Sequence, residues 1–317
     1  PRSEKIPQFV IDNSLQEMKQ KMLETLLGMG FTEVITYSLV GKDLLGRTNL
    51  NYTEEWLRVS NYLSKEQEFL RPVLVASILE VASHNFKHQI ENIRIFEWGK
   101  IYLNKGQPQE FPYLGICLTG KPFSGWMRKE KEISFYDLKG VIELILNQLG
   151  IKKVSFLSRE NHPYLEKGFS GEIKIEEESL GFVGKIKEEV QKRFDLPEEV
   201  YWAELDLNKL ASFVSFRRMY EDLPRFPFVS RDISFLVEEN ITYDMLEKFF
   251  KDFPTDLLKE TTLIDVYKGG NIPLGKKSLT FSLKFQSSER TLRDEEVEEV
   301  MLKIREGLIQ RFHAEIR

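Results

Sequence analysis

The sequence predicts an α+β protein in which a larger sheet-containing module precedes a small domain with the element order βαββαβ. Helical periodicity occurs at 14–28, 72–88 and 136–150, and strand-like segments lie between and after these helices. The stretch 219–232 contains two prolines and no regular period, which indicates a domain boundary. We therefore predict a module over 1–215, a linker over 216–223 and a second domain over 224–317.

The larger module begins with a helix over 14–28, which carries its apolar residues on one face. The segment 31–40 is predicted to be a strand, with Ile35, Tyr37 and Leu39 on one side. A second helix is predicted over 72–88, with Pro72 in its first turn. A third helix covers 136–150, and the remaining elements are strands at 93–103, 113–120, 153–157, 171–176, 180–186 and 200–206 and a short helix at 207–213.

The second domain contains four predicted strands and two predicted helices in about 95 residues. The strands are DISFLVE, TTLIDVYKG, KSLTFSLKFQ and AEIR, and the helices are YDMLEKFFKDF and DEEVEEVMLKIREGLIQRF. Their order along the chain is βαββαβ, which is the ferredoxin-like arrangement.

The amino-acid composition excludes several classes of protein. Hydrophobic residues make up 41% of the 317 residues, which is enough for a substantial core, and no apolar run reaches the roughly 18 to 20 residues that a membrane helix needs. The single cysteine, Cys117, excludes a disulfide framework and a cysteine-based zinc site, and it fits a reducing cytoplasm. A formal net charge of −5 means that any contact with nucleic acid must come from a local basic patch.

Several segments together resemble a known family. PRFPFVSRDISF (224–235), DVYKG (265–269) and GKKSLTFSLKFQSSERTLRDEEV (275–297) resemble the anticodon-binding domain at the end of bacterial phenylalanine–tRNA ligase β subunits. FTEVITYSLV, EQEFLRPVLVASILEVASHN and IRIFEWGKIY resemble the opening of the catalytic-like module of the same subunit. The resemblance therefore covers nearly the whole chain and adds more than the ferredoxin-like order alone, since that fold hosts many functions.

The resemblance implies a fold and a set of partners. The larger module is expected to be similar to the antiparallel-sheet catalytic domain of class II aminoacyl-tRNA synthetases, without its chemistry. The family's β subunit pairs with a catalytic α subunit in an (αβ)2 heterotetramer that joins phenylalanine to tRNAPhe. ATP and Mg²⁺ serve the complete enzyme and are expected to bind outside this segment. We expect a cytoplasmic protein with no membrane and no DNA partner.

The residues themselves favour a module without catalysis. Class II synthetases place an arginine directly after the phenylalanine of an FRxE-type strand, whereas here Arg94 precedes Phe96 in RIFEWGK. No GxGxGxxR segment and no Walker-type loop occur. His84 and His88 have the spacing of two metal ligands on a helix, but the sequence suggests no third ligand, so a polar helix end is the preferred interpretation. We therefore predict no catalytic residue, no metal site and no cofactor in this chain.

Cations and aromatic residues of the second domain are candidates for tRNA contact. From 224 to 317 there are 15 Lys and Arg against 17 Asp and Glu, so the domain is slightly acidic and only the local distribution favours RNA. Phe226 and Phe228 have a core alternative, and Arg231 has a structural alternative in an ion pair with Asp232. The predicted tRNA-binding residues are Arg225, Phe226, Arg231, Lys268, Lys276, Lys277, Arg290 and Arg293.

Two alternatives remain open from the sequence. The chain is compatible with a stand-alone RNA-binding or regulatory relative that kept the synthetase-like fold without joining a ligase. It is also compatible with a small-molecule enzyme built on the larger module, which would require a pocket of convergent polar residues. Binding to a ligase α subunit separates the first alternative from the main hypothesis, and a nucleotide-binding assay tests the second.

Overall fold

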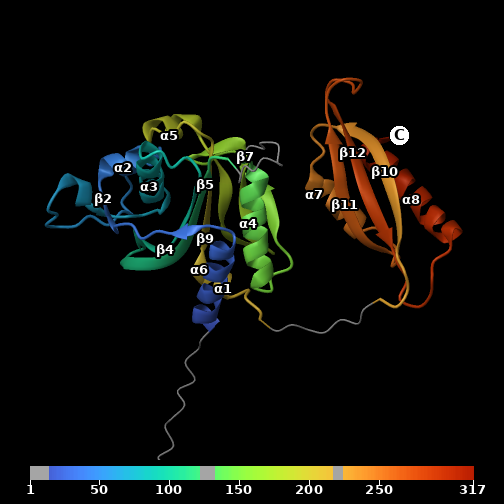
Figure 1. The fold of residues 1–317 in the computed structure, drawn as a ribbon, viewed down its shortest axis with the longest axis horizontal. Coiled ribbons are helices and arrows are strands. Elements are labelled where there is room, and N and C mark those ends of the chain that lie inside the picture. Colours follow the sequence, from blue (N-terminus) through green and yellow to red (C-terminus); the bar gives the residue numbers. More distant parts are fainter. Residues whose placement is uncertain (1–13, 122–132, 217–223) are drawn as a thin grey trace, which may run out of the picture. The chain divides into compact units, whose positions relative to one another are not determined.

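The computed structural model describes residues 14–121, 133–216 and 224–317 (Figure 1). Contacts within the chain divide it into two compact units, Pro1–Arg218 and Met219–Arg317, called here the larger and the smaller unit. Apart from Phe216, the predicted linker over 216–223 lies outside the described residues.

The larger unit is built on a seven-stranded sheet with the order β1-β4-β5-β9-β8-β7-β6. The two-residue strand β1 is parallel to β4, and every other neighbouring pair is antiparallel. In chain order the strands are β1 (Thr32–Glu33), β4 (Ile93–Asn104), β5 (Pro108–Thr119), β6 (Ser155–Ser158), β7 (Leu165–Ile175), β8 (Glu178–Ile186) and β9 (Val200–Asp206).

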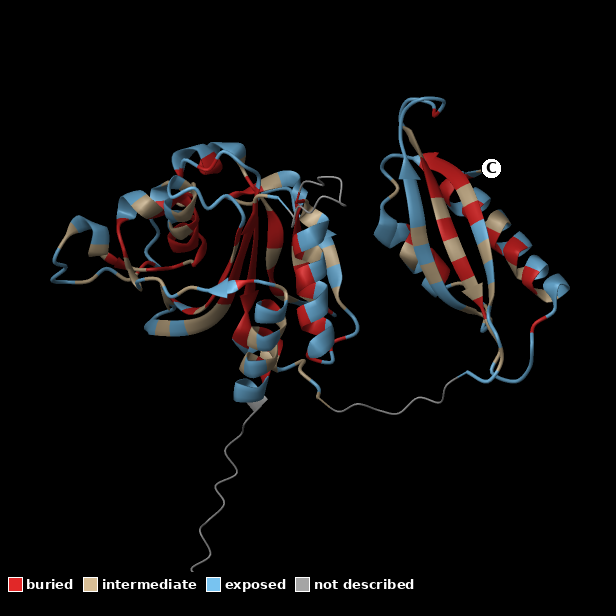
Figure 2. Cartoon of the chain, in the orientation of Figure 1, coloured by how far each residue is buried: buried red, intermediate tan, exposed pale blue. Residues whose placement is uncertain are grey.

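Helices cover both faces of this sheet, so two cores form. On one face, α1 (Ser14–Gly28), α4 (Phe135–Gln148) and α6 (Leu207–Ala211) pack against alternate residues of β5, β8 and β9. On the other face, α3 (Val75–Lys87) and α5 (Glu188–Arg193) pack around the fully buried Trp202. Figure 2 shows the buried strands between these layers.

The packing under α3 is close enough to require a glycine. A Cβ atom on Gly115 of β5 would lie 2.5 Å from the Trp202 ring and 3.1 Å from Ile78 of α3. Such a contact would force a large side chain or the helix to move. Gly115 therefore lets α3 approach the sheet while Trp202 fills the space beside it.

The predicted strand over 31–40 is wrong. It is replaced by β1, by an extended segment and by β2 (Leu39–Val40), which pairs with β3 (Phe69–Leu70). Ile35 and Tyr37 do not face a core, since they are 90% and 84% exposed. The reason lies in Thr36, whose backbone N–H and hydroxyl both donate to the carboxylate of Glu97, 61 residues away. The Glu97 carboxylate thus accepts hydrogen bonds from this segment that a neighbouring strand would otherwise accept.

Two further local predictions need correction. The helix predicted from Pro72 begins only at Val75, with Leu74 as N-cap, and the backbone of Leu74 hydrogen-bonds the Glu204 carboxylate from β9. The group that binds the backbone at the start of α3 therefore comes from a strand distant in sequence, so no local sequence pattern indicates where the helix begins. The sequence also gave no indication of the short elements α2 (Lys42–Gly46), η1 (Lys65–Gln67) and α5.

The smaller unit confirms the βαββαβ prediction. Its strands are β10 (Val229–Glu238), β11 (Leu258–Tyr267), β12 (Lys276–Phe285) and β13 (Glu315–Ile316), in the antiparallel order β11-β12-β10-β13. The register of β11 on β12 shifts twice, between Leu258 and Glu260 and between Leu263 and Asp265. The helices α7 (Tyr243–Lys251) and α8 (Asp294–Phe312) bury their apolar residues against Phe235, Phe281 and neighbouring side chains of one sheet face.

Candidate nucleic-acid interface

The second face of the four-stranded sheet carries hydroxyl groups interspersed with charged side chains, such as Asp232 opposite Ser282 and Asp265 opposite Thr280. In β12 the residues Leu279, Phe281, Leu283 and Phe285 point into the core, so the alternate residues lie on the opposite side. Because both α7 and α8 pack on the core side, this opposite side has no covering helix in the described part of the chain. We call it the hydroxyl face and define it by Ser230, Ser234, Thr262, Ser278, Thr280 and Ser282.

The hydroxyl groups are held next to one another by the register of the strands. Ser230 Oγ and Ser282 Oγ are 3.1 Å apart, and Ser234 Oγ and Thr280 Oγ1 are 2.8 Å apart. Each group can donate or accept a hydrogen bond, so these pairs can open toward a ligand without leaving a buried atom unsatisfied. The face therefore offers an ordered row of reversible hydrogen-bonding groups.

One aromatic residue lies at the edge of this face. Tyr267, the last residue of β11, is paired with Ser278 and is 51% exposed. Neither Tyr267 nor the hydroxyl residues are among the binding residues predicted from the sequence. The alternation of Ser278, Thr280 and Ser282 with apolar residues in KSLTFSLKFQ was the available signal.

The structure separates the predicted tRNA-binding residues into two groups at opposite ends of the sheet. In β10 and β12, Val229 pairs with Phe285 at one end and Glu238 pairs with Lys276 at the other, a span of roughly 30 Å at the usual rise per strand residue. Arg225, Phe226, Arg231, Arg290 and Arg293 belong to the first end, and Lys268, Lys276 and Lys277 to the second.

Most of these cations have carboxylate partners. Arg231 pairs with Asp294 at 2.7 Å and with Glu298 at 3.5 Å, not with Asp232 as the structural alternative proposed. The other ion pairs are Lys268 with Glu239, Lys276 with Glu315 and Arg290 with Glu296. A phosphate would have to compete with these carboxylates.

Contacts with neighbouring charged and polar groups shift the pKa values of Glu296 and Lys277. The hydrogen bond from Arg290 lowers the pKa of Glu296 to about 2. Lys277, whose ammonium group donates to the backbone oxygen of Glu239 at 3.1 Å, has a lowered pKa because it is partly buried and lies near Lys268. Contact of these residues with tRNA stays a prediction.

Arg225, Phe226 and Phe228 differ from one another in their surroundings. Arg225 is exposed and has no ion pair among the described residues. The backbone oxygen of Phe226 accepts a hydrogen bond from Gln286, and Phe228 is 57% exposed, which excludes the core alternative for Phe228. The sequence also places Arg217, Arg218 and Tyr220 close to Arg225 and Phe226 along the chain, and these three residues lie outside the described residues.

In the larger unit, a buried ion pair lies between the sheet and the segment that leads into α3. Arg71 Nη1 is 2.8 Å from Glu97 Oε1, and both side chains are 3% exposed. Arg71 also donates to the backbone oxygen of Lys100 at 2.8 Å and to the Thr36 hydroxyl at 2.6 Å. The guanidinium and carboxylate are thus bound to one another and to Thr36.

A second buried polar group lies on β9. Tyr164 donates to Glu204 at 3.3 Å, and burial raises the pKa of Glu204 to about 7. These residues fill the face of the sheet beneath α3, and no sequence motif identified them.

The histidines and Arg94 have ordinary surroundings. The rings of His84 and His88 are 4.3 Å apart, and His88 Nδ1 contacts the backbone oxygen of His84 at 2.8 Å. No group of three potential metal ligands occurs among the residues that the structure describes. His162 is partly buried beside Tyr164, and burial lowers its pKa to about 4. Arg94 lies on the same strand face as Phe96, against the α1 and α4 core.

Comparison with known proteins decides the family. A family model described as "Phenylalanyl tRNA synthetase beta chain CLM domain" matches residues 5–207. The chain belongs to the phenylalanyl-tRNA synthetase β-chain family. A second model, described as "Ferredoxin-fold anticodon binding domain", matches residues 224–317, which form the smaller unit that carries the hydroxyl face.

Relatives within this family cover nearly the whole chain. It is 36% identical over 306 residues to a phenylalanine–tRNA ligase β subunit of Geobacillus kaustophilus, across 95% of this chain and 38% of the relative. It is 32% identical to the β subunit of Dehalococcoides mccartyi, across 92% of this chain and 36% of the relative. The chain therefore spans less than two fifths of the length of these relatives.

A solved structure supports the fold of this β-chain family member. The pyrrolysyl-tRNA synthetase of Desulfitobacterium hafniense matches 62% of this chain and 67% of its own chain, with a TM-score of 0.50 and 18% identity. This likeness confirms the predicted synthetase-like fold. No helix of the described residues is long and apolar enough to cross a membrane.

Proposed function

We propose that this chain is the C-terminal part of a phenylalanine–tRNA ligase β subunit and that it binds tRNA and an α subunit without performing chemistry itself. The complete enzyme would attach phenylalanine to tRNAPhe in the cytoplasm as an (αβ)2 assembly. The ATP and Mg²⁺ that the ligase reaction consumes or requires would bind at the catalytic site of the complete enzyme, outside this chain. The hydroxyl face, which lies on a domain of the anticodon-binding family, is the observation that carries the proposal.

The chemistry of the hydroxyl face suits unpaired RNA. Serine and threonine hydroxyl groups bind phosphate and ribose oxygens, and an exposed tyrosine ring stacks on a base. Tyr267 supplies such a ring beside Ser278 and Thr280. Since most cations of the smaller unit are already paired, hydrogen bonds and stacking would supply more of the affinity than net charge.

The larger unit supports the partner proposal through one exposed apolar segment. Ile35 and Tyr37 are 90% and 84% exposed, and between them Thr36 is fixed by the buried Glu97 and Arg71. A rigid segment that presents two large apolar side chains is typical of a protein interface. We assign this segment to the contact with the α subunit.

The substitution Tyr267→Ala tests the RNA-binding part of the proposal. Loss of one stacked base costs on the order of 1–3 kcal/mol, so we expect the dissociation constant for tRNAPhe to rise about tenfold. The measurement is filter binding of tRNAPhe by the chain reconstituted with an α subunit. Tyr136→Ala is the control, because Tyr136 is 77% exposed on α4 of the larger unit. Equal affinities of the Tyr267→Ala variant and the unchanged protein would remove the hydroxyl face from the proposal.

A further inference from the structure

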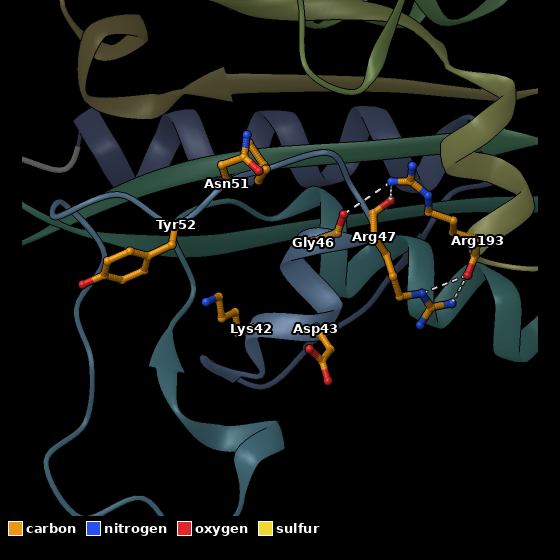
Figure 3. Close-up of a pocket in the computed structure, with 8 residues that line it drawn as sticks. Lys42, Asp43, Gly46, Arg47, Asn51, Tyr52 and Arg193 are labelled. Atoms are coloured by element: carbon orange, nitrogen blue, oxygen red, sulfur yellow. Dashed lines mark hydrogen bonds between the residues drawn. The ribbon is translucent and has the colours of Figure 1, made fainter.

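A surface pocket in the larger unit combines several cations with an aromatic ring (Figure 3). It has a volume of about 400 Å³ and lies where the ends of α2 and α5 meet the segment that follows α2. Its polar wall consists of Lys42, Asp43, Arg47, Asn51, Tyr52 and Arg193. None of these residues belongs to the hydroxyl face or to the exposed segment at Ile35 and Tyr37.

Two arginines of the pocket hold each other in place. Arg47 donates from Nε to the backbone oxygen of Arg193 at 2.9 Å and from Nη2 to the same oxygen at 2.5 Å. Arg193 donates from Nη1 to Asn49 Oδ1 at 2.5 Å and contacts the backbone oxygens of Gly46 and Arg47 at 3.4 Å. Each side chain thus binds carbonyl groups at the C-terminal end of the other's helix, and Arg47 also stacks 4.0 Å from the Phe194 ring.

The positive charge of the pocket is only partly neutralised by carboxylates. Among the residues that the structure describes, Lys42 and Arg193 form no ion pair, whereas Arg47 pairs with Glu80 at 4.0 Å and lies close enough to Asp195 to contribute to the lowered pKa of that carboxyl. Asp43 is the acidic residue of the pocket wall. The smaller unit differs, because Arg231, Arg290 and Lys276 are each bound to a carboxylate there. A pocket that keeps Lys42 and Arg193 without an ion pair among the described residues, in a chain of net charge −5, is suited to an anionic ligand.

The aromatic residue adds information about the ligand. Tyr52 is 51% exposed, and its ring is held edge-on against Trp56 and tilted against Phe69, at centroid distances of 5.7 and 5.8 Å. Lys42 Nζ lies 5.8 Å from the ring centroid. In Figure 3, Lys42 and Tyr52 lie on one side of the pocket and the two arginines on the other. This separation suits a ligand with more than one anionic group and a flat ring.

We propose that this pocket binds the phosphate groups of a nucleotide, with Arg47, Arg193 and Lys42 as phosphate partners and Tyr52 as a stacking surface for the base. Guanidinium groups suit phosphate because several N–H donors lie in one plane, and here they are fixed before the ligand arrives. The nucleotide could belong to an RNA strand or be free in solution. Both sources share the same chemistry, and the experiment separates them.

The variant that tests the pocket is Lys42→Glu. Lys42 is exposed and has no structural hydrogen bond, so its replacement should leave the fold intact. The full chain is titrated with tRNAPhe, with a single-stranded RNA octamer and with ATP, at several salt concentrations. We expect the dissociation constant of the true ligand to rise about tenfold, with a salt slope lower by about one.

Two further variants make the result decisive. Arg193→Gln retains a donor for the carbonyl contacts and should weaken the same ligand about threefold, with the thermal melting curve as a check on folding. Lys192→Glu is the control, because Lys192 is adjacent on α5, is paired with Glu188 and does not line the pocket. Loss of RNA affinity in Lys42→Glu but not in Lys192→Glu assigns the pocket to an RNA strand, and selective loss of ATP affinity assigns it to a free nucleotide.

Unchanged affinity for all three probes in Lys42→Glu would overturn the proposal. Equal losses in Lys42→Glu and Lys192→Glu would also overturn it, because they would indicate a general charge effect. The outcome is independent of the hydroxyl face, since Tyr267→Ala tests that face in the other unit.

Discussion

The two sheets of this chain differ in how their faces are used. The seven-stranded sheet of the larger unit is covered by helices on both faces, and its polar groups Arg71, Glu97 and Glu204 are buried. The four-stranded sheet of the smaller unit is covered by helices on one face, and on the other face Ser230 is exposed and Ser234, Thr280 and Ser282 are partly exposed, whereas Ser278 is buried. Both faces of the first sheet are therefore used for packing, whereas one face of the second sheet has no covering helix among the described residues.

The polar groups of the two sheets therefore have different tasks. Arg71 and Glu97 bind each other and Thr36, so they hold a surface segment in position. In the hydroxyl pairs Ser230–Ser282 and Ser234–Thr280 the two side chains bind each other, and each hydroxyl can exchange that partner for a ligand or water. This difference can be tested by removing one group from each environment.

The largest effect is expected from Arg71→Met. It leaves the Glu97 carboxylate buried without its cation, and loss of one partner of a buried ion pair costs about 3–5 kcal/mol. The measurement is urea unfolding of the larger unit, followed by tryptophan fluorescence, because all four tryptophans precede residue 203. Capture of the α subunit should weaken in parallel, since Thr36 would lose its anchor. The control is Lys192→Glu, and a loss below 1 kcal/mol would show that the ion pair does not organise this face.

An intermediate effect is expected from Glu204→Gln, and it depends on pH. Burial raises the pKa of Glu204 to about 7, so the folded protein holds a proton that the unfolded chain releases near pH 4.5. The stability that this proton provides is complete below about pH 4.5 and is lost as pH rises through 7. The unchanged protein should therefore lose on the order of 2 kcal/mol relative to Glu204→Gln over this window.

Unfolding of the larger unit at pH 5, 6, 7 and 8 measures this difference. Glu199→Gln is the matched control, because Lys185 lowers the pKa of that more exposed carboxyl and its contribution has the opposite sign. Parallel pH profiles of the unchanged protein and Glu204→Gln would show that Glu204 is not protonated in the folded state.

The smallest effect is expected from Thr280→Val on the hydroxyl face. The substitution removes one hydroxyl group at nearly constant shape, so tRNAPhe affinity should fall about two- to fivefold, in line with one neutral hydrogen bond. Thr261→Val is the control, because the register opposite Leu283 places Thr261 on the helix side of the same sheet. An equal loss of affinity in both variants would indicate a change in the sheet itself and would contradict a specific role for its open face.

The local order of the smaller unit was predictable because its signals are local. Alternating residues in KSLTFSLKFQ and the acidic start of DEEVEEVMLKIREGLIQRF fix a strand and a helix without help from the rest of the chain. The prediction of a strand over 31–40 was wrong for the opposite reason. The conformation of this segment depends on Glu97, and nothing in FTEVITYSLV indicates that partner.

The candidate site shows the same limit. The cations of the smaller unit were identified from their density along the chain, but their distance from one another depends on the register of β10 and β12. Their neutralisation depends on Asp294, Glu296 and Glu315, which come from α8 and β13. The pocket at Arg47 and Arg193 could not be predicted from the sequence, because it joins residues that are 146 positions apart.

The register shifts in β11 have a consequence for how this protein behaves at high concentration. β11 is the outer strand of its sheet, and an outer strand with exposed Ile264, Val266 and Tyr267 is a template for pairing with another molecule. Two irregularities within ten residues interrupt the spacing of its outward N–H and C=O groups. A second chain cannot align with such an edge over its full length, so the irregular strand protects the domain from edge-to-edge aggregation.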